Sequence, residues 1–269
     1  MVAGTLATGT SYGLEVVYEP DLREFIRRLP DLTVAPPTVH LVMLAVRSKK
    51  AKELMGIKIK DLVVERSIVR PIPIWRDRYF ADVWNLAVLQ HFGYYDMKTE
   101  TKNLDRIPTE TMGILATIAP RNVRFAVADM MKEDVEMLYR IDDSSLMELA
   151  KVPSRFFGHL HSHPAKDGFR SVTVDIDSTD ELRFAEIHDL LSSFKIFMAT
   201  QTSGGFHVVL DLTNKDHARD FYAGGKSTCA VLTANYGNWL EIQRDSQEPV
   251  PGTLYARPGG EHFYVRLLV

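Results

Sequence analysis

One stretch, FFGHLHSHPAKDGFRSVTVDID, carries two sets of residues whose types and spacing suit metal chemistry. Three histidines alternate at His159, His161 and His163, and two aspartates alternate at Asp175 and Asp177. Imidazole nitrogens suit zinc, whereas carboxylate oxygens suit the harder ions Mg²⁺ and Mn²⁺. The two sets therefore predict two different kinds of enzyme.

The aspartates belong to a pattern that is typical of a β-strand. In RSVTVDID, Val172, Val174 and Ile176 alternate with polar residues, and residues two apart on a strand point to the same face. Asp175 and Asp177 are therefore expected to project side by side. Two like charges this close cost free energy unless a cation neutralises them, so the pattern predicts an Mg²⁺ or Mn²⁺ site. A solvent-facing polar strand edge is the alternative.

A second set of residues follows one predicted helix later. TSGGFHVVL places Ser203, Gly204 and Gly205 in a turn between two apolar strands, and His207 at the start of the second strand. Glycines let the backbone approach a ligand closely, and backbone N–H groups beside an imidazole donor suit a phosphate group. The turn therefore predicts a binding site for a nucleoside triphosphate next to the aspartate pair.

A third acidic residue is expected to complete such a site. LEIQRDSQEPVPGTLY supplies Asp245, which a PGT turn follows shortly afterwards. Asp211 and Glu241 are alternatives for the same role.

The order of these motifs resembles the archaeo-eukaryotic primase superfamily, over roughly residues 170–269. The core of that family has a strand with Asp-x-Asp, a Ser/Gly-x-His element on the next hairpin and a third aspartate on a later strand, followed in several archaeal members by a PGS or PGT turn. The resemblance implies metal ligands and a phosphate-binding element at five positions, which are Asp175, Asp177, Gly205, His207 and Asp245.

The same resemblance implies an activity and partners. It implies a primase-type nucleotidyltransferase that uses Mg²⁺ or Mn²⁺, binds a nucleoside triphosphate and acts with DNA or RNA. It also implies an accessory protein subunit as a partner, since small primase subunits often require one. Phe206 stands directly before His207 where the family often has a basic residue. A non-catalytic nucleic-acid-binding protein on a degenerate primase core is therefore an alternative.

The histidine set resembles a second family, the JAMM metalloisopeptidases, over residues 158–175. Their signature is His-x-His-Pro, then a serine seven residues later and an aspartate after two more. His161, His163 and Ser171 fit this spacing, whereas Asp175 comes one position late. The resemblance implies an alternative zinc site formed by the two histidines and Asp175. A structural role for the histidines at the rim of the carboxylate pocket is the simpler interpretation.

Charge is distributed unevenly along the chain of 269 residues, whose net charge is −3. Ten Lys or Arg residues stand against four Asp or Glu residues between positions 45 and 80. A near-neutral total can conceal a basic face that binds nucleic acid, and a solvated, helix-rich surface is the equal alternative. The candidate contacts to a nucleic-acid backbone are Arg47, Lys49, Lys50, Lys52, Arg66 and Arg70.

Composition also limits the class of protein and its expected location in the cell. A hydrophobic content of 45% with 25% charged residues is ordinary for a globular protein, and no stretch approaches the roughly 20 apolar residues of a membrane span. The single cysteine, Cys229, leaves no internal disulfide and no cysteine-built zinc site. The first residues lack the features of a secretory signal. An intracellular, cytoplasmic protein without a membrane partner is therefore expected.

The elements that must position these residues divide into two regions. In residues 1–150, TVHLVMLAVRSKKAKELMG, DRYFADVWNLAVLQHFGYY and PTETMGILATIAPRNVRFAVADMMKEDVEMLYRI predict helices, and KDLVVERSIVRPIPIW predicts a strand with turns. In residues 151–269, RSVTVDID, KIFMAT, FHVVLDL and NWLEIQRD predict strands around the helix STDELRFAEIHDLLSSF. The expected fold is α+β, with a helical N-terminal region that carries the basic stretch, followed by a primase-like mixed or antiparallel sheet with flanking helices. One continuous domain is the alternative to two.

Overall fold

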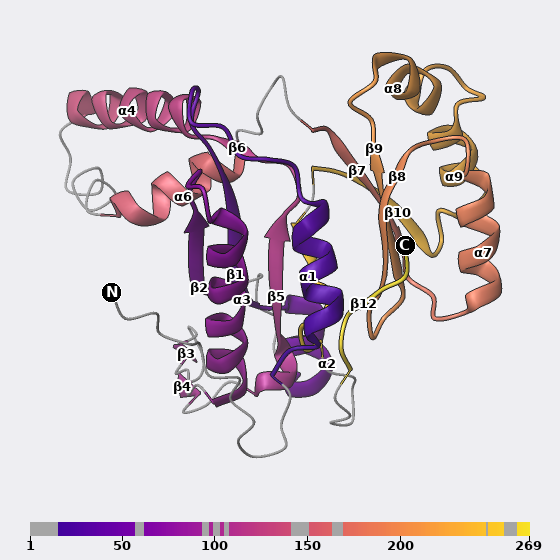
Figure 1. The fold of residues 1–269 in the computed structure, drawn as a ribbon, viewed down its shortest axis with the longest axis horizontal. Coiled ribbons are helices and arrows are strands. Elements are labelled where there is room, and N and C mark those ends of the chain that lie inside the picture. The colour runs from indigo at the N-terminus through magenta and orange to yellow at the C-terminus, as the bar shows by residue number, and fades with distance from the viewer. Residues whose placement is uncertain are drawn as a thin grey trace.

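The fold combines helices with two main antiparallel sheets, which Figure 1 shows side by side. No helix in the described ranges is both long enough and apolar enough to cross a membrane. The structure, a computed structural model, describes residues 16–56, 62–92, 97–98, 103–104, 108–140, 151–162, 169–245, 247–255 and 263–269.

The first sheet has the strand order β11-β5-β1-β2, and β6 pairs with the start of β1. All of its pairings are antiparallel. Because β11 comes from the C-terminal region and pairs with β5, the two regions of the chain share this sheet. A division at residue 150 remains a prediction. The strands are β1 (Thr38–Val46), β2 (Leu62–Val69), β5 (Met112–Thr117), β6 (Arg121–Asn122) and β11 (Gln247–Pro249).

The prediction of a mostly helical N-terminal region is wrong at β1 and β5. Every residue of β1 is buried, with Val42 and Leu44 in the core on one face and Leu41 and Met43 in a second cluster on the other. A strand that is buried on both faces has a continuous apolar run in place of alternation, and such a run cannot be distinguished from a buried helix by its period. The predicted helix begins only at α2 (Ser48–Met55).

Helices cover both faces of the first sheet. The core on one side gathers residues of α1 and α3, and the cluster on the other side gathers residues of α4 and α6. Three short elements lie nearby, η1 (Thr109–Thr111), β3 (Met97–Lys98) and β4 (Asn103–Leu104). The covering helices are α1 (Glu19–Arg28), α3 (Trp75–Phe92), α4 (Val123–Arg140) and α6 (Val152–Ser162).

The second sheet confirms the predicted antiparallel sheet with flanking helices. Its order is β10-β7-β9-β8-β12, and the chain runs β7-α7-β8-β9-α8-α9-β10. This is the ferredoxin-like split βαβ arrangement. Its elements are β7 (Ser171–Ile176), α7 (Glu181–Leu190), β8 (Ile196–Gln201), β9 (Phe206–Asp211), α8 (Lys215–Tyr222), α9 (Thr228–Tyr236), β10 (Leu240–Arg244) and β12 (Arg266–Leu267).

The two faces of the second sheet have different roles. Val174 and Val208 belong to the face that packs against α7, α8 and α9, which lie on its outer side in Figure 1. Met198 and Val209 belong to the opposite face and join the core of the first sheet. Since side chains alternate along a strand, Asp175 shares this inward face, which turns toward the first half of the molecule.

Candidate metal and nucleotide site

Asp175 lies at the centre of a row of polar side chains that crosses three strands. It is directly opposite His207 on β9 and Glu241 on β10 in the antiparallel register, so all three side chains share one face. The Nε2 atom of His207 lies 3.5 Å from Oδ1 of Asp175. Asp177 follows the end of β7, where its side chain is exposed. The structure thus brings together Asp175 and His207, which the sequence predicted as one site.

Glu248 is a member of this site that the sequence analysis did not identify. It lies on β11 of the first sheet, and its side chain is only 1% exposed. Its Oε2 atom lies 2.9 Å from Nδ1 of His207, and its Oε1 atom accepts a hydrogen bond from the hydroxyl of Thr173. Its position shortly before the PGT turn is the one signal in the sequence that could have identified it.

The structure does not bring Asp245 to this site. Its backbone N–H donates to the carbonyl of Ser171 at the start of β7, four residues from Asp175, which corresponds to roughly 13 Å along a strand. Its carboxylate pairs with the fully buried guanidinium of Arg121. Asp211, one of the alternatives, also lies opposite Ser171 and pairs with Lys195. The structure therefore places Asp245 and Asp211 away from Asp175, whereas Glu241, the other alternative, lies directly opposite Asp175 on β10. Glu248 is a further carboxylate, on the far side of His207.

The electrostatics of the site couple His207 to the carboxylates on either side of it. Burial lowers the pKa of His207, but the hydrogen bond to Glu248 and the negative charges of Glu248 and Asp175 outweigh it, so the pKa lies above its ordinary value. Burial raises the pKa of the Asp175 carboxyl and the charge of His207 lowers it, but the charges of Asp177, Glu248 and Glu241 add to the effect of burial, so the pKa lies above its ordinary value. A cation placed beside Asp175 would relieve both causes.

Replacing Glu248 by glutamine is expected to lower the pKa of His207, because only the charge of Asp175 then opposes the effect of burial. Folding raises the pKa of His207, so its protonation stabilises the fold. This stabilisation is complete at a pH below the unfolded pKa, near 6.5, and is lost as the pH rises through the folded pKa. Wild type should therefore exceed Glu248→Gln in stability by the widest margin in mildly acidic solution. An NMR titration of the His207 ring measures the shift directly.

Glu241→Gln is the matched control for this titration. It removes an exposed charge on β10, which pairs with β7 on the side opposite to the strand of His207. The His207 pKa should stay close to that of wild type in this variant. An unchanged His207 pKa in Glu248→Gln would show that the contact between the two residues is not an ion pair in solution.

The turn between β8 and β9 lies directly against the aspartate segment. A Cβ atom on Gly205 would stand 1.9 Å from the carbonyl oxygen of Ile176 and 3.0 Å from the backbone nitrogen of Ser178, so only glycine fits there. A Cβ atom on Gly204 would meet nothing within 4 Å. The predicted phosphate turn therefore has one closely packed glycine and one glycine that faces open space.

Helix α2 places basic side chains beside both parts of the site. The Nζ atom of Lys49 lies 2.9 Å from Oδ1 of Asp177, and the Nζ atom of Lys50 lies 3.1 Å from the hydroxyl oxygen of Ser203. The charge of Arg47, the residue before the helix, also acts on His207. The ammonium of Lys49 thus places a positive charge next to Asp177, in a position where a metal ion would also be attracted.

The other candidate contacts to a nucleic-acid backbone lie on different elements. Lys52 is exposed on α2, and Arg70 is exposed just beyond β2. Arg66 donates to the hydroxyl of Ser154 on α6 and lies over the ring of Phe157. Only the α2 part of the basic stretch is therefore brought to the candidate site.

The histidine set occupies a different environment. His161 lies on helix α6, where burial lowers its pKa, as does the charge of Arg121, whereas Asp245 opposes them. His159 on the same helix contacts Glu133 of α4, and His163 lies outside the described residues. Asp175 lies on a strand, and the charges that act on it do not include His161. The zinc site stays an untested prediction.

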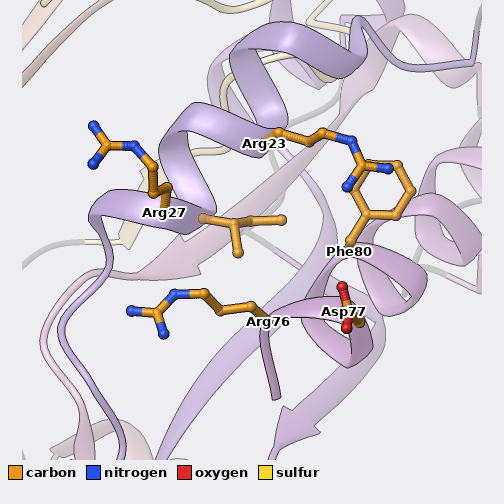
Figure 2. A pocket seen from close by; sticks show the side chains of 6 residues that line it. Arg23, Arg27, Arg76, Asp77 and Phe80 are labelled. Atoms are coloured by element: carbon orange, nitrogen blue, oxygen red, sulfur yellow. The ribbon is translucent and has the colours of Figure 1, made fainter. Parts of the chain in front are cut away.

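A separate shallow pocket of about 170 Å³ lies between α1 and α3. Figure 2 shows its arginines, with the guanidinium of Arg23 over the ring of Phe80 at 4.4 Å. Each of these arginines pairs with an acidic residue, Arg23 with Glu19, Arg27 with Glu24 and Arg76 with Asp31. Because the charge of this pocket is largely neutralised, it is a weaker candidate for an anion site than the inward face of the second sheet.

Within the described ranges, no group of three or more His, Cys, Asp or Glu side chains is arranged to hold a metal ion. An Mg²⁺ ion is commonly held by one or two carboxylates, with phosphate oxygens and water completing its shell. Asp175 and Asp177 supply the two carboxylates that such a mode requires, and a metal ion at this place stays a prediction. No family model matches the chain, and neither a curated protein nor a solved structure was found to be similar to it.

Proposed function

We propose that this protein is a primase-like, metal-dependent nucleotidyltransferase that binds a nucleoside triphosphate and acts with DNA or RNA. The observation that carries the proposal is the contact of Asp175 with His207, beside a turn in which Gly205 packs against the end of the aspartate strand. The split βαβ arrangement supports it, because it places all of these residues at adjacent strands.

Each residue has a role in this proposal. Asp175 and Asp177 would hold Mg²⁺ or Mn²⁺, which supplies charge neutralisation for a triphosphate and for the charge that develops during transfer. His207, whose pKa Glu248 raises, would in its protonated form donate from Nε2 to a phosphate oxygen at the carboxylate end of the site. Backbone N–H groups of the Ser203–Gly205 turn would contact the same phosphate chain.

The nucleic-acid contacts are proposed on α2. Arg47, whose charge acts on His207, directly precedes this helix, and Lys52 is exposed on it; the phosphate backbone of DNA or RNA attracts such side chains without regard to sequence. A non-catalytic protein on the same core would keep these contacts and lose the need for metal. An accessory subunit and a location inside the cell are part of the same proposal.

The test is a calorimetric titration of wild-type protein with a nucleoside triphosphate, with and without Mn²⁺, followed by an assay of nucleotide incorporation. The proposal predicts binding that requires Mn²⁺, and incorporation that requires it too. Binding without incorporation would leave a nucleotide-binding protein. If wild type binds no nucleotide with either metal, the proposal fails.

A further inference from the structure

Lys50 is a buried lysine that the roles above do not use. It lies in the first turn of α2 and is only 9% exposed. Its Nζ atom lies 3.1 Å from the hydroxyl oxygen of Ser203 and 3.9 Å from the centre of the Tyr255 ring. The side chain therefore spans from the first half of the molecule to the turn of the second sheet that is proposed to hold phosphate.

Burying an ammonium group costs free energy, and each anion nearby lessens that cost. Burial lowers the pKa of Lys50 to about 8, the charge of Arg47 lowers it as well, and Glu53 opposes both. An anionic phosphate beside Nζ would offset this cost, because it favours the charged form of the amine. The environment of Lys50 is thus one in which a bound phosphate would stabilise the group.

The turn beside Lys50 is also open on one side. Gly205 is packed against the aspartate segment, whereas the Cα atom of Gly204 faces space in which a Cβ atom would meet nothing within 4 Å. The neighbouring Lys49 reaches the opposite end of the site, at Asp177. Of these two consecutive lysines of α2, Lys49 therefore reaches Asp177 and Lys50 reaches the Ser203 turn.

We infer that Lys50 binds the terminal phosphates of the nucleotide at the Ser203–Gly204 turn, and that it makes the site selective for nucleoside triphosphates over monophosphates. The inference rests on the proposed function and adds a phosphate ligand from the first half of the molecule. A monophosphate held at the carboxylate end would not reach Lys50. A triphosphate, which is longer, would extend to it.

The test compares Lys50→Met with Lys132→Met, a control that removes an exposed lysine on α4, away from the proposed site. Calorimetry with Mn²⁺ measures the dissociation constants of a nucleoside triphosphate and of its monophosphate. Lys50→Met is expected to weaken triphosphate binding by roughly 10- to 100-fold, the loss of one charge-assisted hydrogen bond, and to leave monophosphate binding unchanged. Lys132→Met should bind both as wild type does.

A second variant tests the inference without removing the buried lysine. Gly204→Val places a side chain in the open space beside Ser203 and should also weaken triphosphate binding alone. Wild-type triphosphate affinity in both Lys50→Met and Gly204→Val would overturn the inference while leaving the proposed function in place. An equal loss of both ligands in the two variants would overturn it too. A wild type that binds neither nucleotide would remove the proposed function itself.

Discussion

Replacing Asp175 and Asp177 together by asparagine is expected to abolish Mn²⁺-dependent binding of a nucleoside triphosphate. Asparagine keeps the shape of each side chain but removes both negative charges that would hold the metal. Removing even an outer-shell partner of a metal ligand typically costs 10- to 100-fold in affinity, so loss of two direct ligands should exceed about 100-fold. The dissociation constant from calorimetry, measured in the presence of Mn²⁺, reports this loss.

The fold should tolerate this double substitution. The variant removes the repulsion between the Asp175 and Asp177 carboxylates, and the ion pair between Lys49 and Asp177 that it breaks is exposed on both sides and contributes little. It also breaks the contact of Asp175 with His207, but His207 keeps its partner Glu248. The matched control is Asp189→Asn with Asp220→Asn, which removes two exposed aspartates on α7 and α8. Metal-dependent binding that survives in the Asp175/Asp177 variant would direct attention to the histidines, and zinc analysis would then be the next step.

Replacing Gly205 by alanine is expected to cause the largest loss of stability of any variant considered. The added Cβ atom would stand 1.9 Å from the carbonyl oxygen of Ile176, and the atoms that it meets are backbone atoms that cannot rotate away. The turn or the end of β7 must therefore move. Overpacking typically costs 1–3 kcal/mol and occasionally more, so a loss of about 3 kcal/mol is expected in denaturant titrations.

Gly204→Ala provides the control for this prediction, one residue away in the same turn. Its Cβ atom meets nothing within 4 Å, and the change should alter the free energy of unfolding by no more than about 0.5 kcal/mol. Equal stability of the two alanine variants would mean that the turn does not pack against the aspartate segment as described. The site would then lose the contact that joins its phosphate-binding and metal-binding parts.

The sequence predicted the second sheet better than the first for a physical reason. β7 has one face against helices and one polar face, so Val172 and Val174 alternate with Thr173 and Asp175, and the pattern is unambiguous. Asp180 caps α7 by accepting from the N–H of Leu182, as the Ser/Thr/Asp sequence indicates. The strands β1 and β5 are buried on every residue, so their apolar runs carry no period that separates strand from helix.

The candidate site was predicted in its local parts and not in its long-range contacts. Asp175 and His207 come from motifs that could be read within a few residues of sequence. Glu248 joins them from a strand of the other sheet, and no local pattern states which sheet its strand will join. Asp245 has a left-handed backbone conformation, with φ of 51°, at the end of β10, and its carboxylate pairs with Arg121. The identity of the third acid therefore depends on tertiary packing.

The most direct measurement is an anomalous-diffraction map of crystals grown with Mn²⁺ and a non-hydrolysable nucleoside triphosphate. The account predicts a manganese peak between the carboxylates of Asp175 and Asp177, with the phosphate chain running along the Ser203–Gly205 turn toward Lys50. A manganese peak beside His161, or a triphosphate bound in the arginine pocket between α1 and α3, would contradict it.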